Sequence, residues 1–509
     1  MLKSFGISNF KAFDSFQSFS VAPITLIYGP NSGGKSSIIQ SLMLLKQSLA
    51  SPINQRIRDR SLILKGPYVD LGQSKSIHHK HNTSRAVSFK AAFDGKNNRY
   101  PNSLIAGDHE FTVETSFQEA SHKGGHAMVE LTGVSYGARN LNRTASFESS
   151  LERVRKNPGD VSADGGQSYF AKAFQFKTWA DVSSLAKFVE LLPRVKAQEH
   201  QRDLLGWLDG ITPESYQPLS VVPRPNLITG KVTFLPHYIR NRASSEQRPG
   251  GASDYVSRIL NQIARGYSEI FESASYLGPH RNRPRRLYEL DHQYQGSVGV
   301  SGEYLVEALT EDLYSEGPEA ESDGVVKEVN RWLERFEIPY LLSVDSLGDE
   351  VVGDIATLKL YDRRADVRVA ATDVGFGIGQ LLPVIIEGVI AQGSAKTLNR
   401  DRLLCVEQPE IHLHPRLQAH VADFFIDTWK KGGCQWIAET HSEALMLRLQ
   451  RRIRAGDIDA KDVSVVFVNP IPGYGSEILN LRIDDQGEFI DEWPGGFFEE
   501  TFHEMFPRV

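Results

Sequence analysis

Cysteine is scarce in this chain, with 2 residues among 509. Both Cys405 and Cys434 lie in apolar, strand-like stretches, so we expect buried thiols rather than a disulfide framework or a cysteine metal site. No window reaches the ~18 consecutive apolar residues that a membrane span needs. The first segment, Met1 to Phe10, lacks the basic start, the long apolar run and the small-residue cleavage site of a signal peptide. These absences predict a cytoplasmic protein that does not cross a membrane.

An excess of positive charge is also absent. The chain has 57 Lys and Arg against 63 Asp and Glu, and its net charge is −6. Bulk electrostatics therefore do not indicate a nucleic-acid binder, and any such surface must be local. We find no internal repeat and no sustained heptad pattern, which argues against a long coiled-coil arm.

What is present is an alternation of strand and helix patterns at both ends of the chain. Near the start, the apolar run 24–28 leads through a Gly-rich loop into a helical pattern from Lys35 to Leu49. Near the end, apolar runs at 403–406, 435–438 and 463–468 alternate with helical patterns that begin after Pro415 and at about Ser442. The prediction is an α/β fold in which both chain ends build one parallel sheet and the less regular segment 95–275 is an insertion.

The Gly-rich loop fits the pattern G-x-x-x-x-G-K-[ST] and lies where that pattern requires it, after a strand and at the start of a helix. Such a loop presents backbone N–H groups to phosphates. Lys35 would contact the β- and γ-phosphates of ATP, and the Ser36 hydroxyl would coordinate Mg²⁺. The predicted nucleotide-binding residues of the loop are Gly29, Pro30, Asn31, Ser32, Gly33, Gly34, Lys35, Ser36 and Ser37.

Two later strand ends carry further candidates. The run 403–406 ends in Glu407, which we predict to be the acid on the Mg²⁺ side. His412 and His414 follow it; a zinc site or simple helix capping are the alternatives there. His441 lies just after the next strand, at the edge where open α/β sheets bind ligands. It is a candidate sensor of the γ-phosphate, and the alternative is that Thr440 or Ser442 only caps a helix.

Together these motifs resemble a known family. The segments ISNFKAF at the N-terminus, GPNSGGKSS, VEQPEIHLHP and ETHSE are similar to those of ATP-binding-cassette (ABC) ATPases of the RecF, SMC and OLD type. The segments YLGP, DVGFGIGQLLP and WPGGFF resemble a bacterial subgroup that has a small C-terminal domain and is often encoded in defence islands.

The resemblance implies a homodimer that holds two ATP molecules between its subunits, each P-loop facing the signature segment of the partner. Gly375 and Gly377 occupy the signature position, although the usual signature serine is missing and Gly379 also departs from the subgroup pattern. Gln73 lies near the place of the family's Q-loop, where it would reach Mg²⁺ and the attacking water. An exposed turn glutamine is the alternative.

One departure bears on the reaction. In the family a glutamate follows the metal-binding acid and polarises the attacking water, and this chain has Gln408 there. A neutral amide orients water but does not accept its proton. Glu410, two residues on, is the candidate substitute. We therefore expect slow ATP hydrolysis and a long-lived ATP-bound dimer.

The resemblance also suggests a division of the chain into four parts. They are an N-terminal ATPase lobe (1–94), an insertion for a partner or DNA (95–275), a C-terminal ATPase lobe (276–470) and a small C-terminal domain (471–509). Only 68 residues follow His441, too few for the Toprim nuclease of OLD proteins, and Asp484 and Asp485 have the composition of a hairpin turn. No nuclease is therefore expected within the chain.

Local basic clusters at 280–286 and at Arg448, Arg451, Arg452 and Arg454 leave DNA binding open, with a solvated or ATP-proximal basic face as the alternative. Three functions follow from these observations. The first is a defence ATPase that controls a separate nuclease or toxin effector. The others are a RecF-like repair ATPase that binds DNA, and an ATP-binding scaffold without hydrolysis.

Overall fold

The computed structural model describes residues 1–50, 61–94, 109–121, 127–140, 146–153, 174–176, 220–222, 238–240, 252–290, 294, 296–310, 324–348, 353–398 and 401–496. Large parts of the predicted insertion, and residues 497–509 of the predicted C-terminal domain, lie outside these. The chain divides into two compact units. The first comprises 1–18, 40–272 and 472–475, and the second comprises 19–39, 273–471 and 476–509.

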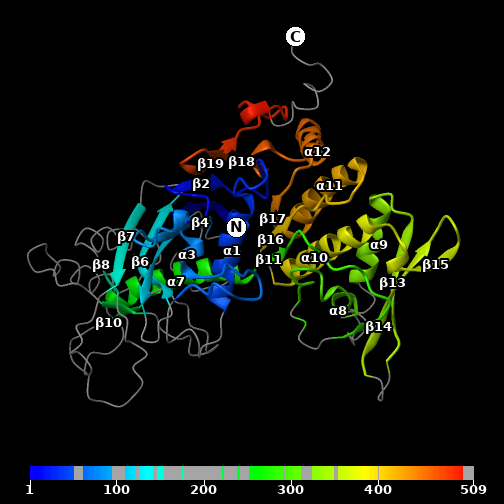
Figure 1. Cartoon of the computed structure of the whole chain (residues 1–509), viewed down its shortest axis with the longest axis horizontal. Coiled ribbons are helices and arrows are strands. Elements are labelled where there is room, and N and C mark those ends of the chain that lie inside the picture. The colour runs from blue at the N-terminus through cyan, green and yellow to red at the C-terminus, as the bar shows by residue number, and fades with distance from the viewer. Residues whose placement is uncertain are drawn as a thin grey trace, which may run out of the picture. The chain divides into compact units, whose positions relative to one another are not determined.

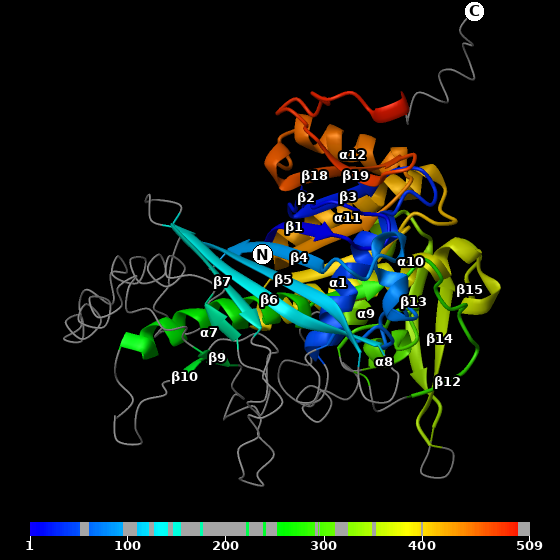
Figure 2. The ribbon, with the colours of Figure 1, turned by 60° about the vertical axis from the view of Figure 1, so that its left-hand side comes forward.

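The second unit is built on a six-stranded sheet with the order β11-β16-β17-β3-β18-β19. Its strands are β3 (Ile24–Tyr28), β11 (Ser275–Leu277), β16 (Arg402–Glu407), β17 (Cys434–Glu439), β18 (Val463–Ile471) and β19 (Gly475–Leu481). The pairs from β11 to β18 are parallel, and every residue of β3 and β17 is buried, as expected for central strands covered on both faces. Segments from the two ends of the chain thus lie side by side (Figures 1 and 2), which confirms the predicted α/β fold.

Helices α10 (Phe376–Leu398) and α11 (Pro415–Gly432) pack on this sheet, and α12 (Glu443–Arg454) packs on α11. Helices α11 and α12 begin where the sequence predicted, and so does α1 (Lys35–Ala50), which follows the Gly-rich loop. The ends of α11 follow its sequence, because His414 caps the first turn, Pro415 occupies the first helical position and Gly433 ends the helix at φ 67°. In the core, Phe425 of α11 stacks on Trp436 of β17 with ring centroids 4.3 Å apart.

A smaller antiparallel sheet belongs to the same unit. It contains β12 (Tyr288–Glu289), β13 (Tyr340–Ser346), β14 (Ile355–Asp362) and β15 (Val367–Ala370), with α8 (Leu305–Thr310) and α9 (Val325–Arg335) beside it. Trp332 of α9 packs edge-on against Phe424 of α11, with centroids 4.8 Å apart. This contact makes α9 part of the same hydrophobic core as the parallel sheet.

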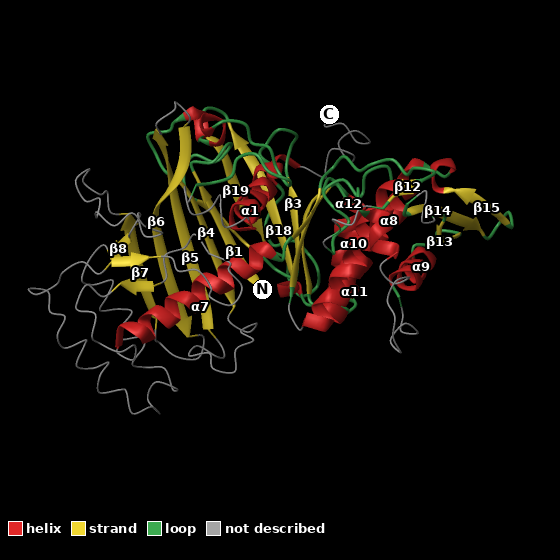
Figure 3. Cartoon of the chain, turned by 90° about the horizontal axis from the view of Figure 1, so that it is seen from below, coloured by secondary structure: helices red, strands yellow, loops and turns green. Residues whose placement is uncertain are grey.

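The first unit contains a nine-stranded sheet with the order β10-β9-β8-β7-β6-β5-β4-β1-β2. The strands are β1 (Leu2–Ser8), β2 (Gln17–Ser20), β4 (Val87–Asp94), β5 (His109–Ser121), β6 (Ala127–Asn140), β7 (Ser146–Arg153), β8 (Phe174–Phe176), β9 (Ser220–Val222) and β10 (Tyr238–Arg240). Helix α7 (Ala252–Glu272) lies across one face of this sheet (Figure 3). The proposed boundary at residue 94 falls inside this unit, because β4 and β5 are neighbouring antiparallel strands.

Among the described residues, one helix is long and apolar enough to cross a membrane. It is the segment Phe376–Lys396 of α10, and 78% of its apolar window is buried inside the protein. This is the environment of a core helix.

Candidate functional site

The predicted nucleotide loop connects β3 to α1, as the motif requires. Gly29 has φ 142°, and a Cβ there would lie 2.4 Å from the Val468 carbonyl oxygen, so the neighbouring strand leaves no room for a side chain. The Lys35 Nζ donates hydrogen bonds to the carbonyl oxygens of Gly29 and Pro30, each at 3.0 Å. Burial lowers the pKa of Lys35. The strand, loop and helix predicted around the motif are confirmed.

Two carboxylates meet this loop from adjacent strands. Glu407 ends β16 and Glu439 ends β17, and the two residues are partners in the parallel register. The Ser36 Oγ donates to Glu439 Oε2 at 2.8 Å, and Lys35 Nζ lies 4.0 Å from Glu439 Oε1. Glu407 Oε1 accepts a hydrogen bond of 2.7 Å from the Tyr276 hydroxyl. The end of the P-loop is therefore lined by a hydroxyl and two buried carboxylates.

Burial and the neighbouring charge of Glu439 raise the pKa of Glu407 to about 7. Burial likewise raises the pKa of Glu439. Two carboxylates in one buried place favour a cation between them, because each makes the ionised form of the other costly. Hydroxyl and carboxylate oxygens are also the ligands that Mg²⁺ prefers. The donor set of Ser36, Glu407 and Glu439 thus fits Mg²⁺.

Glu439 is the residue that the sequence-based prediction missed. A signal for it was present, because the rule that places His441 after the strand also places Glu439 at the strand's carboxyl end. What the sequence did not show is the register that brings Glu439 to Ser36, 403 positions away in the chain.

Gln408 follows Glu407 in a left-handed conformation with φ 46°. A non-glycine residue held in this region costs roughly 1 to 3 kcal/mol. Its backbone N–H donates to the Glu439 carbonyl oxygen at 2.7 Å, which ties the turn after β16 to the end of β17. The structure thus holds Gln408 in a strained turn directly beside the two carboxylates.

Glu410 and His441 are brought together. Glu410 is 7% exposed, and its Oε1 accepts the backbone N–H of His441 at 2.7 Å. Burial raises the pKa of Glu410 and lowers the pKa of His441, to which the charge of Lys35 also contributes. Ser442 caps α12 by accepting the Leu445 N–H at 3.1 Å. The capping interpretation thus holds for Ser442, while His441 lies within the electrostatic reach of the P-loop lysine.

The predicted signature segment opens α10. Gly375 is exposed, and a Cβ there would meet no atom within 4 Å. At Gly377 a Cβ would lie 2.5 Å from the His412 carbonyl oxygen, so this glycine allows α10 to approach the segment after β16. The Phe376 ring contacts the His412 ring edge-on, with centroids 4.7 Å apart. His414 acts as a helix cap, since its Nδ1 accepts the Arg416 N–H at 3.3 Å.

Gln73 lies in the first unit, where it precedes the short helix α3 (Ser74–Ile77) and its side chain is exposed. Its Q-loop role stays a prediction. Asp484 forms the expected hairpin turn, because its carboxylate accepts the N–H groups of Gln486 and Glu488.

The basic clusters are largely engaged within the second unit. On α12, Arg448 and Arg452 both donate to Asp423, and Arg454 pairs with Glu488. Just before β12, Arg286 donates to Asp373 of the signature segment at 2.8 Å. Pairing with carboxylates reduces the positive charge that these arginines offer to phosphates.

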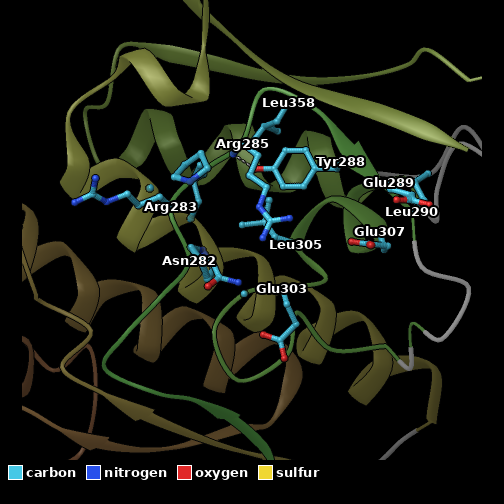
Figure 4. A pocket seen from close by; sticks show the side chains of 15 residues that line it. Asn282, Arg283, Arg285, Tyr288, Glu289, Leu290, Glu303, Leu305, Glu307 and Leu358 are labelled. Carbon is cyan, nitrogen blue, oxygen red and sulfur yellow. Dashed lines mark hydrogen bonds between the residues drawn. The ribbon is translucent and has the colours of Figure 1, made fainter.

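A pocket of 660 Å³ lies between the start of α10, α8 and the small sheet. Asn282, Arg285, Tyr288 and Glu307 are among the residues that line it (Figure 4). Its lining includes no residue of the P-loop, so it is distinct from the predicted nucleotide site.

Solved structures similar to this chain include three heads of SMC proteins. An SMC head bound to the C-winged helix domain of ScpA has 11% identity and a TM-score of 0.39, over 94% of this chain and 97% of that chain. The SMC head domain from Thermotoga maritima has 9% identity and a TM-score of 0.35, over 95% and 99%. An Smc head with an extended coiled coil, bound to the C-terminal domain of ScpA derived from Pyrococcus furiosus, has 11% identity and a TM-score of 0.38, over 94% and 96%.

No curated protein matches the chain in sequence. A family match does exist, and it covers residues 24–447, from the first strand of the parallel sheet to the middle of α12. The span includes the P-loop, the signature segment and both strand-end carboxylates. The chain is a P-loop ATPase that belongs to the family described as "AAA domain, putative AbiEii toxin, Type IV TA system".

Proposed function

We propose that this protein is a slow, nucleotide-gated dimeric switch, the ATPase or sensor subunit of an anti-phage defence system that controls a separate nuclease or toxin effector. The observation that carries the proposal is the P-loop Lys35 and Ser36 beside the buried carboxylates of two strand ends, one of which is followed by Gln408 in place of the usual glutamate. Such a protein binds ATP tightly and hydrolyses it slowly.

The residues of the P-loop suit ATP. Lys35 would give up its two carbonyl contacts for the phosphates, and the N-terminus of α1 favours negative charge. Ser36, Glu407 and Glu439 would hold Mg²⁺, which offsets the charge that develops on the phosphates during hydrolysis. His441 would reach the γ-phosphate from the end of β17.

Slow turnover is supported by the surroundings of the two candidate residues for activating water. Gln408 orients a water molecule through its amide but accepts no proton from it. One carboxylate oxygen of Glu410 is engaged by the His441 N–H, and the side chain is buried. Loss of a general base commonly lowers the rate by ~10² to 10⁴.

The dimer and the effector rest on resemblance. The exposed Gly375 leaves the start of α10 open to a second subunit, in keeping with a signature segment that contacts the partner's ATP. The description of the family names a putative toxin and a TA system, which supports a role in a system that has a toxic component. The engaged arginines of α12 give less support to the alternative of a DNA clamp.

The test is the mass of the purified protein by light scattering in ATP·Mg²⁺, in ADP·Mg²⁺ and without nucleotide. We expect a dimer or larger assembly in ATP that persists for many minutes, and none for Lys35→Ala, which lacks the phosphate-binding cation. An ATP-independent mass, equal for wild type and Lys35→Ala, would contradict the gated switch.

A further inference from the structure

Arg281 lies four residues after β11 and is 5% exposed. Its guanidinium donates to the Glu407 carbonyl oxygen at 2.6 Å and to the Gln408 carbonyl oxygen at 3.3 Å. A guanidinium that is nine-tenths buried must find acceptors inside the protein, because it keeps its charge at neutral pH. Here those acceptors are the backbone of the strand end that carries the Mg²⁺-side acid.

The same arginine also contacts the signature helix. Arg281 donates to the Gln380 carbonyl oxygen at 3.5 Å, and the Gln380 side-chain amide donates back to the Arg281 carbonyl oxygen at 3.2 Å. Gln380 is buried and lies in the first turns of α10, which begins at Phe376. Arg281 therefore bridges the start of the signature helix and the peptide of Gln408.

The turn that receives this bridge is strained. Gln408 keeps its left-handed conformation while both of its backbone groups are hydrogen-bonded. Its N–H donates to the Glu439 carbonyl, and its carbonyl accepts from Arg281 at 3.3 Å and from the Ile411 N–H at 3.2 Å. These contacts fix the backbone from which the Gln408 side chain extends. A shift of the α10 N-terminus would move Gln380, and with it the Arg281 side chain that donates to the Gln408 carbonyl.

We infer that Arg281 and Gln380 are positioning residues that couple the signature segment to Gln408, so that a partner's nucleotide at the signature segment orients the water-binding amide. This inference rests on the proposed function, because it needs an ATP that engages the signature segment. It assigns to Arg281 a role within the chain, and not a contact with DNA, which was one alternative for the cluster 280–286.

The test uses Gln380→Met, which removes the side-chain amide and keeps a side chain of similar length. The matched control is Gln392→Met, a second buried glutamine on α10. In single-turnover hydrolysis at saturating ATP, we expect Gln380→Met to be roughly tenfold slower with its KM for ATP within twofold of wild type. Gln392→Met should match wild type.

A double variant distinguishes positioning of the Gln408 amide from a purely structural role of Gln380. In Gln408→Ala there is no amide to orient, so adding Gln380→Met should cause no further loss of rate. Arg281→Met should lose more than Arg281→Lys, provided that thermal unfolding shows both variants to be folded. If either arginine variant fails to fold, the Gln380 series still decides the question.

The outcomes separate the two claims. If wild type hydrolyses ATP and Gln380→Met has the same rate, the coupling is wrong while the switch stands. An equal loss in the wild-type and Gln408→Ala backgrounds would also overturn the coupling. If wild type neither binds nor hydrolyses ATP better than Lys35→Ala, the proposed function fails, and the inference fails with it.

Discussion

At the scale of single residues, the site concentrates buried charge. Lys35, Glu407 and Glu439 lie together at the ends of the P-loop and of two strands, with Ser36 between them. Buried carboxylates are tolerated where a cation is to be bound, and they cost stability where it is missing. The free energy of unfolding of the nucleotide-free protein should therefore be lower than it would be without these buried carboxylates.

The free-energy cost of ionising the buried Glu407 carboxyl predicts that the stability of the protein depends on pH. The Glu407 carboxyl would ionise near pH 4.5 in the unfolded chain, and its pKa is about 7 in the folded protein. Between these values the folded protein holds a proton that the unfolded chain has lost, so the free energy of unfolding falls as pH rises through this window. We expect Glu407→Gln to raise the Tm of the nucleotide-free protein at pH 8 and to change it little at pH 5. Thermal unfolding at the two pH values measures this.

The matched control is the exposed Glu492→Gln, which should leave both Tm values unchanged. A lower Tm for Glu407→Gln at pH 8 would show that the ionised carboxylate stabilises the fold, contrary to this account. With ATP·Mg²⁺ the order should reverse, because only the wild type offers the full charge to the metal.

At the scale of elements, several central strands and helices of the second unit followed from the sequence, whereas its small antiparallel sheet and the helices α8 and α9 were not predicted. The apolar run predicted at 435–438 is β17 (Cys434–Glu439), and the helix predicted from about Ser442 is α12 (Glu443–Arg454). Both are local patterns, fixed by burial on two faces and by a cap. The burial of Arg281 and the approach of Glu439 to Ser36 depend on long-range packing, which local patterns do not encode.

The start of α10 offers an element-scale prediction. Gly377→Ala would place a methyl group 2.5 Å from the His412 carbonyl oxygen, whereas Gly375→Ala meets open space. We expect Gly377→Ala to lower the free energy of unfolding by roughly 1 to 3 kcal/mol, because backbone must move to admit the methyl group. Urea unfolding of both variants measures this, and Gly375→Ala should stay within about 0.5 kcal/mol of wild type. Equal stabilities would contradict the close packing of α10 on the segment after β16.

At the scale of the whole molecule, the second unit joins the two chain ends in one sheet. The family match, over 24–447, covers the P-loop, the signature segment and both acidic strand ends. All the predicted site residues except Gln73 belong to this unit. The first unit carries the nine-stranded sheet, of which β1, β2 and β4 precede the predicted insertion and β5 to β10 lie within it. The prediction missed the strand signal of β5, whose residues alternate between buried and half-buried from His109 to Phe117.

The central claim is that Gln408 keeps ATP turnover slow, so that nucleotide state acts as a switch. The most direct measurement is steady-state phosphate release by wild type and Gln408→Glu at equal ATP binding, with and without DNA. The account predicts that Gln408→Glu is at least roughly tenfold faster than wild type, since a carboxylate restores a proton acceptor, and that DNA changes neither rate. A Gln408→Glu rate no faster than wild type, or a brisk wild-type rate that DNA accelerates, would contradict it.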